Sequence, residues 1–330
     1  MARRTTLVIT AAAVRALTTT PLHDVTPLLR SAPLSTKLGC DVFFKMDCAQ
    51  PPGSFKLRGI GATVSAAVAD GADGVVSSSG GNAGLATAHA ARALGIACTV
   101  VLPTTTPESV RRKLERDYGA KVVVEGGVWD EANERAKELA AESRRPLVHP
   151  FEGPTTWTGH ATLVAEVDAQ LGDLGLAMDA IVCCVGGGGL LAGVLEGIGD
   201  RADCVVVAAE TVGADSFAKS FAARKPVTIP ITSIAKSLGA GTPSPTVLKN
   251  ALASNRVHPH VVSDAAAVRA CVAFADERRV LVEPACGAAL ACLYGEPPSV
   301  LKDRRCVVVE VCGGAVVGVE QMDAWAGQLL

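Results

Sequence analysis

Residues 74–102, GVVSSSGGNAGLATAHAARALGIACTVVL, decide the fold that we predict for this chain. The apolar run at 74–78 predicts a buried strand, the alanine-rich stretch from Asn82 to Leu94 predicts a helix, and residues 97–102 predict a second strand. Strands that are hydrophobic throughout and alternate with helices indicate a parallel sheet covered on both faces. The stretch therefore predicts an α/β protein.

The same alternation continues along the chain. Further strands are predicted at residues 121–124, 146–149, 180–185, 204–208 and 306–311. Helices are predicted from Pro107, over about 130–142, and through Leu171, with a pause in the pattern at 150–156. We see no repeat, low-complexity tract or flexible linker. We therefore expect two α/β domains with the active site in the cleft between them, because ligands bind in crevices at the carboxyl ends of parallel strands.

Composition limits the classes of partner. The chain has 330 residues, 49% of them hydrophobic and 19% charged, which describes a compact protein with room for two domains. A net charge of −2 gives no reason to expect nucleic acid or an anionic membrane surface as a partner. No stretch reaches the roughly 18 apolar residues of a membrane span. We therefore expect a small-molecule ligand.

The N-terminal segment and the cysteines bear on location. Residues 1–23 contain no acidic residue and resemble a weak transit peptide, although a short N-terminal extension is the interpretation that we favour. The 11 cysteines include no CxxC pair, so a zinc site is not expected. Most lie in apolar surroundings such as 182–185, and cysteines used as core residues indicate a reducing compartment. We therefore expect a cytoplasmic protein.

Lys56 lies in the first of three loops that can share one ligand, QPPGSFKLRG at 50–59. Gly53 permits a tight turn, Ser54 is expected to cap a following helix, and Phe55 can bury the base of the lysine side chain. A lysine amine can form a Schiff base with a carbonyl cofactor, and burial lowers the pKa of that amine. For this segment alone, a solvated basic residue at a helix start is the alternative.

The second loop, SSSGGNAG at 77–84, joins a predicted strand to a predicted helix. Backbone N–H groups at a helix N-terminus bind anions such as a carboxylate or a phosphate. Asn82 can donate a side-chain hydrogen bond to a ligand oxygen. A glycine-rich turn with a serine cap is the alternative.

The third loop, GGGGLLAG at 186–193, follows a predicted buried strand. Its four glycines expose successive N–H donors, which suits a phosphate monoester. The loop lacks the Gly-Lys-Ser/Thr of a nucleotide P-loop, and it fails G-x-G-x-x-G because Leu191 or Ala192 stands where the last glycine belongs. Glu210 nevertheless lies where a dinucleotide site has its ribose-binding acid, so NAD binding and a glycine-rich connection without ligand remain alternatives.

Taken together, these residues closely resemble the serine/threonine dehydratases among the fold-type II pyridoxal-phosphate enzymes. The matching motifs are KMD at 45–47, GSFK at 53–56, SGGNAG at 79–84, the tetraglycine loop, EPACG at 283–287 and VCGG at 311–314. The resemblance covers the chain from about Thr26 and is to the eukaryotic L-serine dehydratase branch. It implies a tryptophan synthase β-like fold with parallel-rich sheets flanked by helices, a large cofactor domain at 1–57 and 150–330, a small α/β domain at 58–149, and a homodimer.

The resemblance also implies residue roles. Lys56 would be the Schiff-base lysine and general base, Phe55 would stack on the pyridine ring, and Asn82 would bond the ring hydroxyl. The backbone amides that would hold the phosphate of pyridoxal 5'-phosphate belong to Gly186, Gly187, Gly188, Gly189 and Leu190. The substrate carboxylate would be received by Ser79, Gly80, Asn82 and Ala83. A monovalent cation, K+, is implied at Glu210, Ala214, Leu238 and Ala240, of which the last two align only with a one-residue gap.

Cys312 bears on the type of reaction. In the family the residue at this position faces the pyridine nitrogen and is Cys in this branch, whereas racemases and threonine deaminases have Ser. A neutral thiol leaves that nitrogen largely unprotonated, which weakens the ring as an electron sink and favours loss of a β-leaving group. One more buried core cysteine is the alternative.

The reaction that the resemblance implies is β-elimination from L-serine, with L-threonine as a second substrate, to pyruvate or 2-oxobutyrate plus ammonia. Lys56 would remove the α-proton, and the cofactor phosphate with Ser79 nearby would protonate the leaving hydroxyl. Gly80 replaces the usual alanine, and Ala315 replaces a polar residue. We expect loss of the alanine methyl to loosen the contact with substrate and ring. The alternatives are a serine racemase, a β-replacement enzyme like cysteine synthase, and a weakly active amino-acid or cofactor-binding paralogue.

Overall fold

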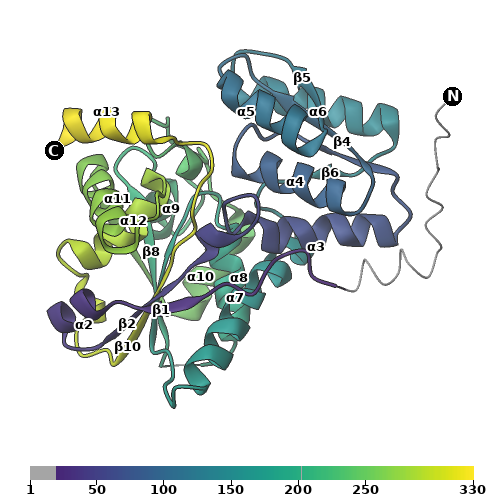
Figure 1. Cartoon of the computed structure of the whole chain (residues 1–330). Coiled ribbons are helices and arrows are strands. Elements are labelled where there is room, and N and C mark those ends of the chain that lie inside the picture. Colours follow the sequence, from purple (N-terminus) through teal and green to yellow (C-terminus); the bar gives the residue numbers. More distant parts are fainter. Residues whose placement is uncertain (1–19, 202) are drawn as a thin grey trace, which may run out of the picture.

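The computed structural model describes residues 20–201 and 203–330, and its strands form two sheets flanked by helices (Figure 1). The N-terminal segment that resembles a transit peptide lies almost wholly outside the described residues. The predicted α/β architecture is confirmed. The pairings in both sheets are parallel except for the β1–β2 edge pair of the larger sheet, because most strands alternate with helices that return the chain to the same end of the sheet.

The larger sheet has six strands in the order β1-β2-β10-β7-β8-β9, and only β1 runs antiparallel to its neighbour. The strands are β1 (Leu28–Arg30), β2 (Asp41–Lys45), β10 (Cys306–Glu310), β7 (Ala180–Cys184), β8 (Val205–Thr211) and β9 (Val257–Val262). The helices that accompany them are α2 (Ala32–Leu38), α7 (Pro154–Gly172), α8 (Gly189–Ile198), α9 (Ser216–Ala223), α10 (Pro245–Ser254), α11 (Asp264–Arg278), α12 (Pro284–Tyr294) and α13 (Val319–Leu329). The central strands are fully buried, as the continuous apolar runs require.

The smaller sheet is wholly parallel and has the order β5-β4-β3-β6. Its strands are β5 (Lys121–Val124), β4 (Ala97–Leu102), β3 (Gly74–Ser77) and β6 (Leu147–Val148). The helices beside it are α4 (Asn82–Ala93), α5 (Glu108–Arg112) and α6 (Trp129–Ser143), and α5 continues into a π-helical turn, η2 (Lys113–Asp117). The βαβ unit predicted from residues 74–102 is therefore β3-α4-β4.

Helix α3 (Lys56–Ala69) runs along the boundary between the two parts of the molecule (Figure 1). It packs against α4 of the smaller part and against α7 of the larger part. The chain enters the smaller sheet after α3 and leaves it after β6. These positions lie close to the domain boundaries that we predict after residues 57 and 149, and the boundaries themselves remain a prediction.

A buried ionic network fixes the start of α3. The guanidinium of Arg58 is fully buried and donates to Asp47 Oδ2 at 2.6 Å and to Glu166 Oε1 at 2.6 Å. Glu166 Oε2 also pairs with the buried Lys45 Nζ at 2.6 Å. Because each charge meets an opposite charge in good geometry, the desolvation cost of burial is offset. The network therefore holds the helix turn that contains Lys56.

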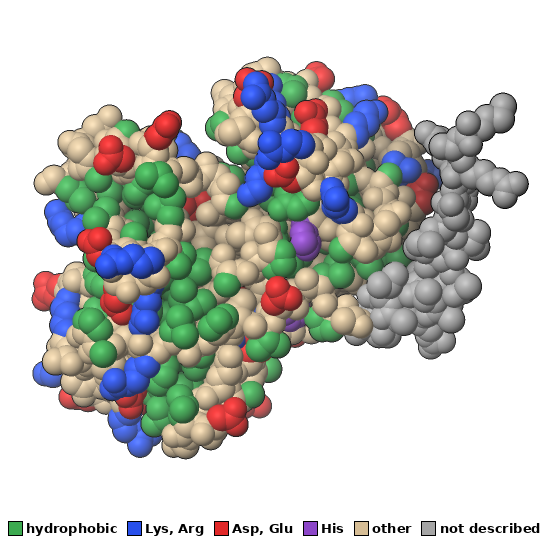
Figure 2. All heavy atoms as spheres, in the orientation of Figure 1, with side chains coloured by type: hydrophobic (Ala, Val, Ile, Leu, Met, Phe, Trp, Pro, Cys, Tyr) green, Lys and Arg blue, Asp and Glu red, His purple; other side chains and the backbone are tan. Residues whose placement is uncertain are grey.

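The surface is mixed in character. Figure 2 shows Lys and Arg side chains interspersed with Asp and Glu on this face, and hydrophobic side chains gathered over the part built on the larger sheet. Exposed hydrophobic residues include Val25, Leu29 and Val319. Within residues 20–201 and 203–330, no helix combines the length and apolar character needed to cross a bilayer.

Candidate active site

Lys56 is the first residue of α3, and its amine is held in a mostly apolar setting. Its Nζ donates to the carbonyl of Pro150 at 2.6 Å and lies 5.1 Å from the centre of the Phe55 ring. Burial lowers the pKa of Lys56 to about 8. A substantial fraction of the amine is therefore neutral, and so nucleophilic and basic, at mildly alkaline pH.

The loop before Lys56 pairs with the loop after β10. Phe55 N donates to Cys312 O at 3.1 Å, and Ser54 forms an antiparallel bridge with Gly313. Gly313 has φ +85°, and a Cβ there would lie 2.4 Å from the carbonyl oxygen of Gly53, so only glycine fits. Two segments far apart in the sequence thus form one unit, which brings Lys56 and Cys312 together.

The expected cap of α3 is wrong. Phe55 occupies the N-cap position and makes no side-chain capping bond. Ser54 Oγ is buried and has no hydrogen-bond partner within the described part of the chain. The bridge between Ser54 and Gly313 fixes the backbone in place of a cap, because it uses main-chain groups. Ser54 is therefore held by long-range backbone pairing and does not cap the helix.

Asn82, the first residue of α4, reaches across to the larger part of the molecule. Its Nδ2 donates to Glu283 Oε1 at 2.9 Å and to Ser237 Oγ at 3.4 Å, and its Oδ1 accepts from Ala315 N at 2.9 Å. These bonds fix the orientation of the amide. Asn82 therefore joins the second loop to the segment that follows Cys312.

Glu283 is a site residue that the sequence did not assign, although it begins the motif at 283–287. Its side chain is buried, burial raises its pKa to about 7, and its Oε2 has no hydrogen-bond partner among the described residues. The available signal was its place directly before Pro284, the first residue of α12. The helix dipole stabilises an acidic residue at a helix start, so this position alone does not indicate that Glu283 belongs to the site.

The loop before α4 contains the residues predicted to receive a carboxylate. Ser79 Oγ accepts from Gly81 N at 3.2 Å, Gly80 directly precedes the N-cap of α4, and Ala83 lies in its first turn. The first amides of a helix lack intrahelical acceptors, so they are available to an anion. The geometry suits a carboxylate at this position.

Gly80 lies against the side chain of Thr106. A Cβ at Gly80 would lie 2.8 Å from Thr106 Oγ1 and 3.2 Å from Leu102 Cδ2, which are atoms of the protein itself. The missing methyl group therefore leaves room for Thr106, and the expected loosening of the contact with substrate and ring remains a prediction. Gly80 and Thr106 fit one another as a pair.

The tetraglycine loop joins β7 to α8 and lies against Phe151. A Cβ at Gly187 would lie 2.4 Å from the Phe151 ring, and one at Gly189 would lie 2.7 Å from the Phe151 carbonyl oxygen. Gly188 has φ +100°. Over residues 20–201 and 203–330, the structure gives the amides of residues 186–188 no hydrogen-bond acceptor. The loop packs closely against Phe151 and keeps amides without an acceptor, and this combination fits a phosphate group.

Cys312 follows β10 and is almost fully buried. Its Sγ lies 3.5 Å from Cys184 Sγ. Hydrogen bonds with Cys184 and Cys286, together with burial, raise the pKa of the Cys312 thiol well above its usual value. The thiol is therefore neutral near pH 7, which is the state that the argument for elimination requires.

The predicted cation ligands lie around the start of α9. The carboxylate of Glu210 accepts from Phe217 N at 2.9 Å and Ala218 N at 2.7 Å, and burial raises its pKa to about 8. The Ala240 carbonyl accepts from Ser216 Oγ at 2.7 Å, and the Leu238 carbonyl accepts from Ala240 N. Ala214 is buried on the turn before α9. Each oxygen retains a lone pair for a cation, and the K+ site remains a prediction.

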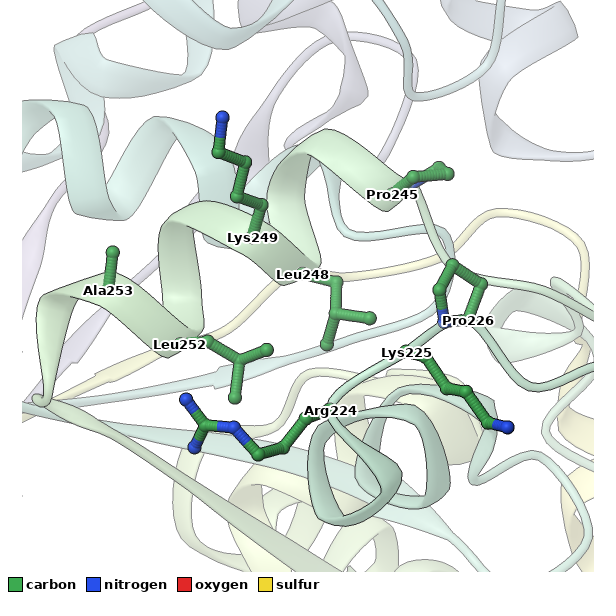
Figure 3. A pocket seen from close by; sticks show the side chains of 8 residues that line it. All are labelled: Arg224, Lys225, Pro226, Pro245, Leu248, Lys249, Leu252 and Ala253. Carbon is green, nitrogen blue, oxygen red and sulfur yellow. The ribbon is translucent and has the colours of Figure 1, made fainter.

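A separate pocket is lined by residues outside these loops. Figure 3 shows its lining side chains, which come from α10 and the segment after α9: Arg224, Lys225, Pro226, Pro245, Leu248, Lys249, Leu252 and Ala253. Its volume is about 410 Å³. It contains none of the residues that we predict to act on a ligand. We therefore place the candidate active site at the three loops.

Comparison with known proteins agrees with this assignment. Residues 19–313 match the family model described as pyridoxal-phosphate dependent enzyme. A human protein named serine dehydratase-like is 45% identical over 92% of this chain and 94% of its own length. A mouse L-serine dehydratase/L-threonine deaminase is 43% identical over 93% of this chain and 96% of its own. A fungal L-serine ammonia-lyase from Rhizomucor miehei superposes with a TM-score of 0.84, at 35% identity over 94% of this chain and 99% of that one.

The fold and the site together define a pyridoxal-phosphate-dependent enzyme of fold type II. This chain belongs to the pyridoxal-phosphate dependent enzyme family. The predicted family, fold and cofactor are confirmed, and the NAD alternative is excluded. The free amides of the tetraglycine loop and the buried amine of Lys56 fit the phosphate and the carbonyl group of this cofactor.

Proposed function

We propose that this enzyme is an ammonia-lyase that eliminates water from L-serine, with L-threonine as a second substrate, and so releases ammonia with pyruvate or 2-oxobutyrate. The observation that carries the proposal is the pairing of the Lys56 loop with the Cys312 loop, which places an amine with a lowered pKa beside a neutral thiol. The relatives named as dehydratases and as an ammonia-lyase support the same reaction.

When bound, pyridoxal phosphate supplies an electron-withdrawing ring for the electron pair that C–H cleavage leaves. Lys56 would hold the cofactor through its Nζ, and its neutral amine would accept the α-proton of the substrate there. Its lowered pKa keeps part of the amine neutral for this task. The amides of Gly186 to Gly189 and of Leu190 would bind the phosphate, Phe55 would pack on the ring, and Asn82 would bond the ring hydroxyl.

The substrate carboxylate is held by the loop before α4. The amides of Gly80 and Ala83, the side chain of Asn82 and the hydroxyl of Ser79 surround the start of the helix. Ser79 Oγ accepts from Gly81 N and keeps its own proton for donation. We therefore assign Ser79 to help protonate the leaving hydroxyl, beside the acid that the phosphate provides.

Cys312 directs the outcome toward elimination. A neutral thiol donates only weakly, so it does not protonate the pyridine nitrogen as an aspartic acid would. Cys312 would thus leave the ring a weaker electron sink, which would favour loss of the β-hydroxyl over return of the α-proton. This argument favours a dehydratase over a racemase.

Assembly, location and domain limits complete the proposal. Leu29 is exposed on edge strand β1, and hydrophobic side chains gather over the part of the molecule built on the larger sheet (Figure 2), which supports a homodimer.

The free state of the eleven cysteines supports a reducing, cytoplasmic location. The two sheets support a large domain at 1–57 and 150–330 and a small one at 58–149. K+ at Glu210, Ala214, Leu238 and Ala240 is part of the proposal.

The test is keto-acid release from L-serine, L-threonine and their D-isomers, with and without K+. We expect pyruvate and 2-oxobutyrate from the L-isomers and no product after Lys56→Ala, which also loses the visible absorption of the attached cofactor. Accumulation of D-serine without pyruvate would show a racemase. A single spectral change without turnover would show a binding paralogue.

A further inference from the structure

Three buried side chains converge beside Lys56, and the reaction accounts for only one of them. They are Cys184 at the end of β7, Glu310 at the end of β10, and Cys312 two residues later. One ligand atom from each lies within 4.8 Å of the others. We call these residues the thiol–carboxyl cluster. Because Cys184 and Glu310 end strands joined by parallel pairing, the sheet itself assembles the cluster.

Glu310 is the unexplained member. Its side chain is fully buried, and neither carboxyl oxygen has a hydrogen-bond partner among the residues that the structure describes. A buried polar group without a partner costs free energy, so such groups are normally satisfied by hydrogen bonds, by opposite charge or by a metal. The nearest groups in the cluster are two thiols, which are weak donors. The carboxyl therefore lacks a good protein partner.

The spacing and chemistry of the cluster suit a soft divalent cation. Zinc binds thiolate sulfur at about 2.3 Å and carboxylate oxygen at about 2.0–2.2 Å, so tetrahedral ligands lie roughly 3.5–3.8 Å apart. Cys184 Sγ and Cys312 Sγ are 3.5 Å apart. Two sulfurs and one oxygen exclude K+ and Mg2+, which prefer oxygen ligands.

We propose that the thiol–carboxyl cluster binds one Zn2+ or Cd2+ ion in the cofactor-free chain. Cys184 Sγ, Cys312 Sγ and one oxygen of Glu310 form the bonds to the metal, and the thiol and carboxyl protons pass to solvent. Neither oxidant nor reductant is needed. The Lys56 amine is close enough to sense the charge on both sulfurs. The absence of a CxxC pair predicts no zinc site from the sequence, because the ligands of this site lie on and after two neighbouring strands.

The proposal concerns the chain without its cofactor, so it stands apart from the reaction. The full chain, freed of cofactor and of metal by a chelator, is titrated with Cd2+. Binding is followed by the ultraviolet charge-transfer absorption of cadmium thiolates and by equilibrium dialysis. We expect one saturable ion per chain, with no competition from K+ or Mg2+.

Variants separate this site from other thiols. Cys184→Ser and Glu310→Gln each remove one ligand, and we expect each to weaken Cd2+ binding by roughly 100-fold or more. Cys98→Ser is the matched control, since Cys98 is a buried free cysteine on β4 in the other sheet. Glu310→Leu guards against misfolding: without metal it should unfold at the same or a higher denaturant concentration, because it replaces an unpartnered buried carboxyl.

Three results would overturn the proposal. The first is the absence of saturable binding to the parent chain. The second is equal affinity in the parent, Cys184→Ser and Glu310→Gln, which would place the ion elsewhere and leave Glu310 a neutral buried acid. The third is an equal loss of binding in Cys98→Ser, which would show that the effect is not specific to the cluster.

Discussion

Asn82 and Glu283 are joined by a 2.9 Å hydrogen bond from Nδ2 to Oε1, although 201 positions separate them in the chain. The bond ties the first turn of α4 to the start of α12, and so it links the parts of the molecule built on the two sheets. It also places a carboxyl group with a raised pKa beside the amide that we assign to the cofactor ring. The charge of Glu283 is therefore coupled to the site.

We expect Glu283→Gln to stabilise the protein at alkaline pH. Burial raises the pKa of Glu283 from 4.5 to about 7, so the folded chain keeps a proton that the unfolded chain has already lost. Stability from this group is lost as the pH rises from about 4.5 through about 7, and the full cost is roughly 3 kcal/mol. The glutamine keeps an acceptor for Asn82 and carries no charge.

Urea unfolding at several pH values tests this prediction. The stability difference between Glu283→Gln and the parent should grow between about pH 4.5 and 7 and stay level above that range. Glu296→Gln, at an exposed position, is the control and should follow the parent curve. Parallel curves for Glu283→Gln and the parent would show that the carboxyl is not perturbed.

Much of the fold could be predicted because its strands are continuous apolar runs. Residues 97–102 and 121–124 match β4 and β5, and 180–185 extends β7 by one residue. Strand β9 was missed because Val257–Val262 contains histidines and a proline and lies at the sheet edge, where half-burial breaks the apolar run. Strands β1 and β2 were missed because they are short and because Asp41 and Lys45 begin and end β2.

Some residues of the candidate site could be predicted from the sequence, and others could not. Residues in glycine-rich loops could be found because glycine marks a close backbone approach, as at Gly187 against Phe151. Glu283 and Thr106 could not, because their importance depends on partners that only the tertiary structure brings near. Gly80 is the clearest example, since the effect of a larger residue there depends on the side chain of Thr106, which follows 26 positions later.

We expect Gly80→Ala to lower stability, not to improve the site. The added Cβ would lie 2.8 Å from Thr106 Oγ1 and 3.0 Å from Thr106 Cγ2, and overpacking of this kind costs about 1–3 kcal/mol. The backbone at Gly80 needs no positive φ, so the clash is the main cost. The double variant Gly80→Ala with Thr106→Ala removes both clashing atoms and should recover most of the loss.

Thermal unfolding and kcat/KM for L-serine, measured on the parent, both single variants and the double variant, test the pair. Recovery in the double variant beyond the sum of the single effects supports direct contact. Additive effects would show that the two positions are not in direct contact. A Gly80→Ala enzyme that is more active than the parent would support the expectation that the missing methyl group loosens the contact with substrate.

We expect Arg58→Lys to cost more than about 1 kcal/mol of stability, because a lysine lacks the planar fork that bonds Asp47 and Glu166 together and so leaves part of this buried network without a donor. Arg135→Lys is the control. Arg135 pairs with Glu138 on the surface of α6, where an exchange should change stability by less than about 1 kcal/mol. Equal effects of the two substitutions in urea unfolding would show that the buried network does not fix α3.

The last prediction concerns how the cofactor reaches Lys56. Attachment needs the neutral amine, and burial lowers the pKa of Lys56 to about 8. The rate at which pyridoxal phosphate attaches to the cofactor-free chain should therefore rise about tenfold per pH unit below about pH 8 and level off above it. Stopped-flow absorption in the visible range measures this rate, and Lys56→Ala should give no signal. A rate that still rises near pH 10 would show an ordinary lysine.

The charge of Glu283 should also change the pH at which attachment levels off. Its negative charge raises the pKa of Lys56, against the larger effect of burial. Because Glu283 is itself ionised above about pH 7, Glu283→Gln removes that charge in the range where Lys56 titrates. The pH at which attachment levels off should therefore fall in Glu283→Gln and stay unchanged in Glu296→Gln. A rise, or no change in either variant, would mean that the two groups do not sense each other, and that Glu283 acts on the site only through its bond to Asn82.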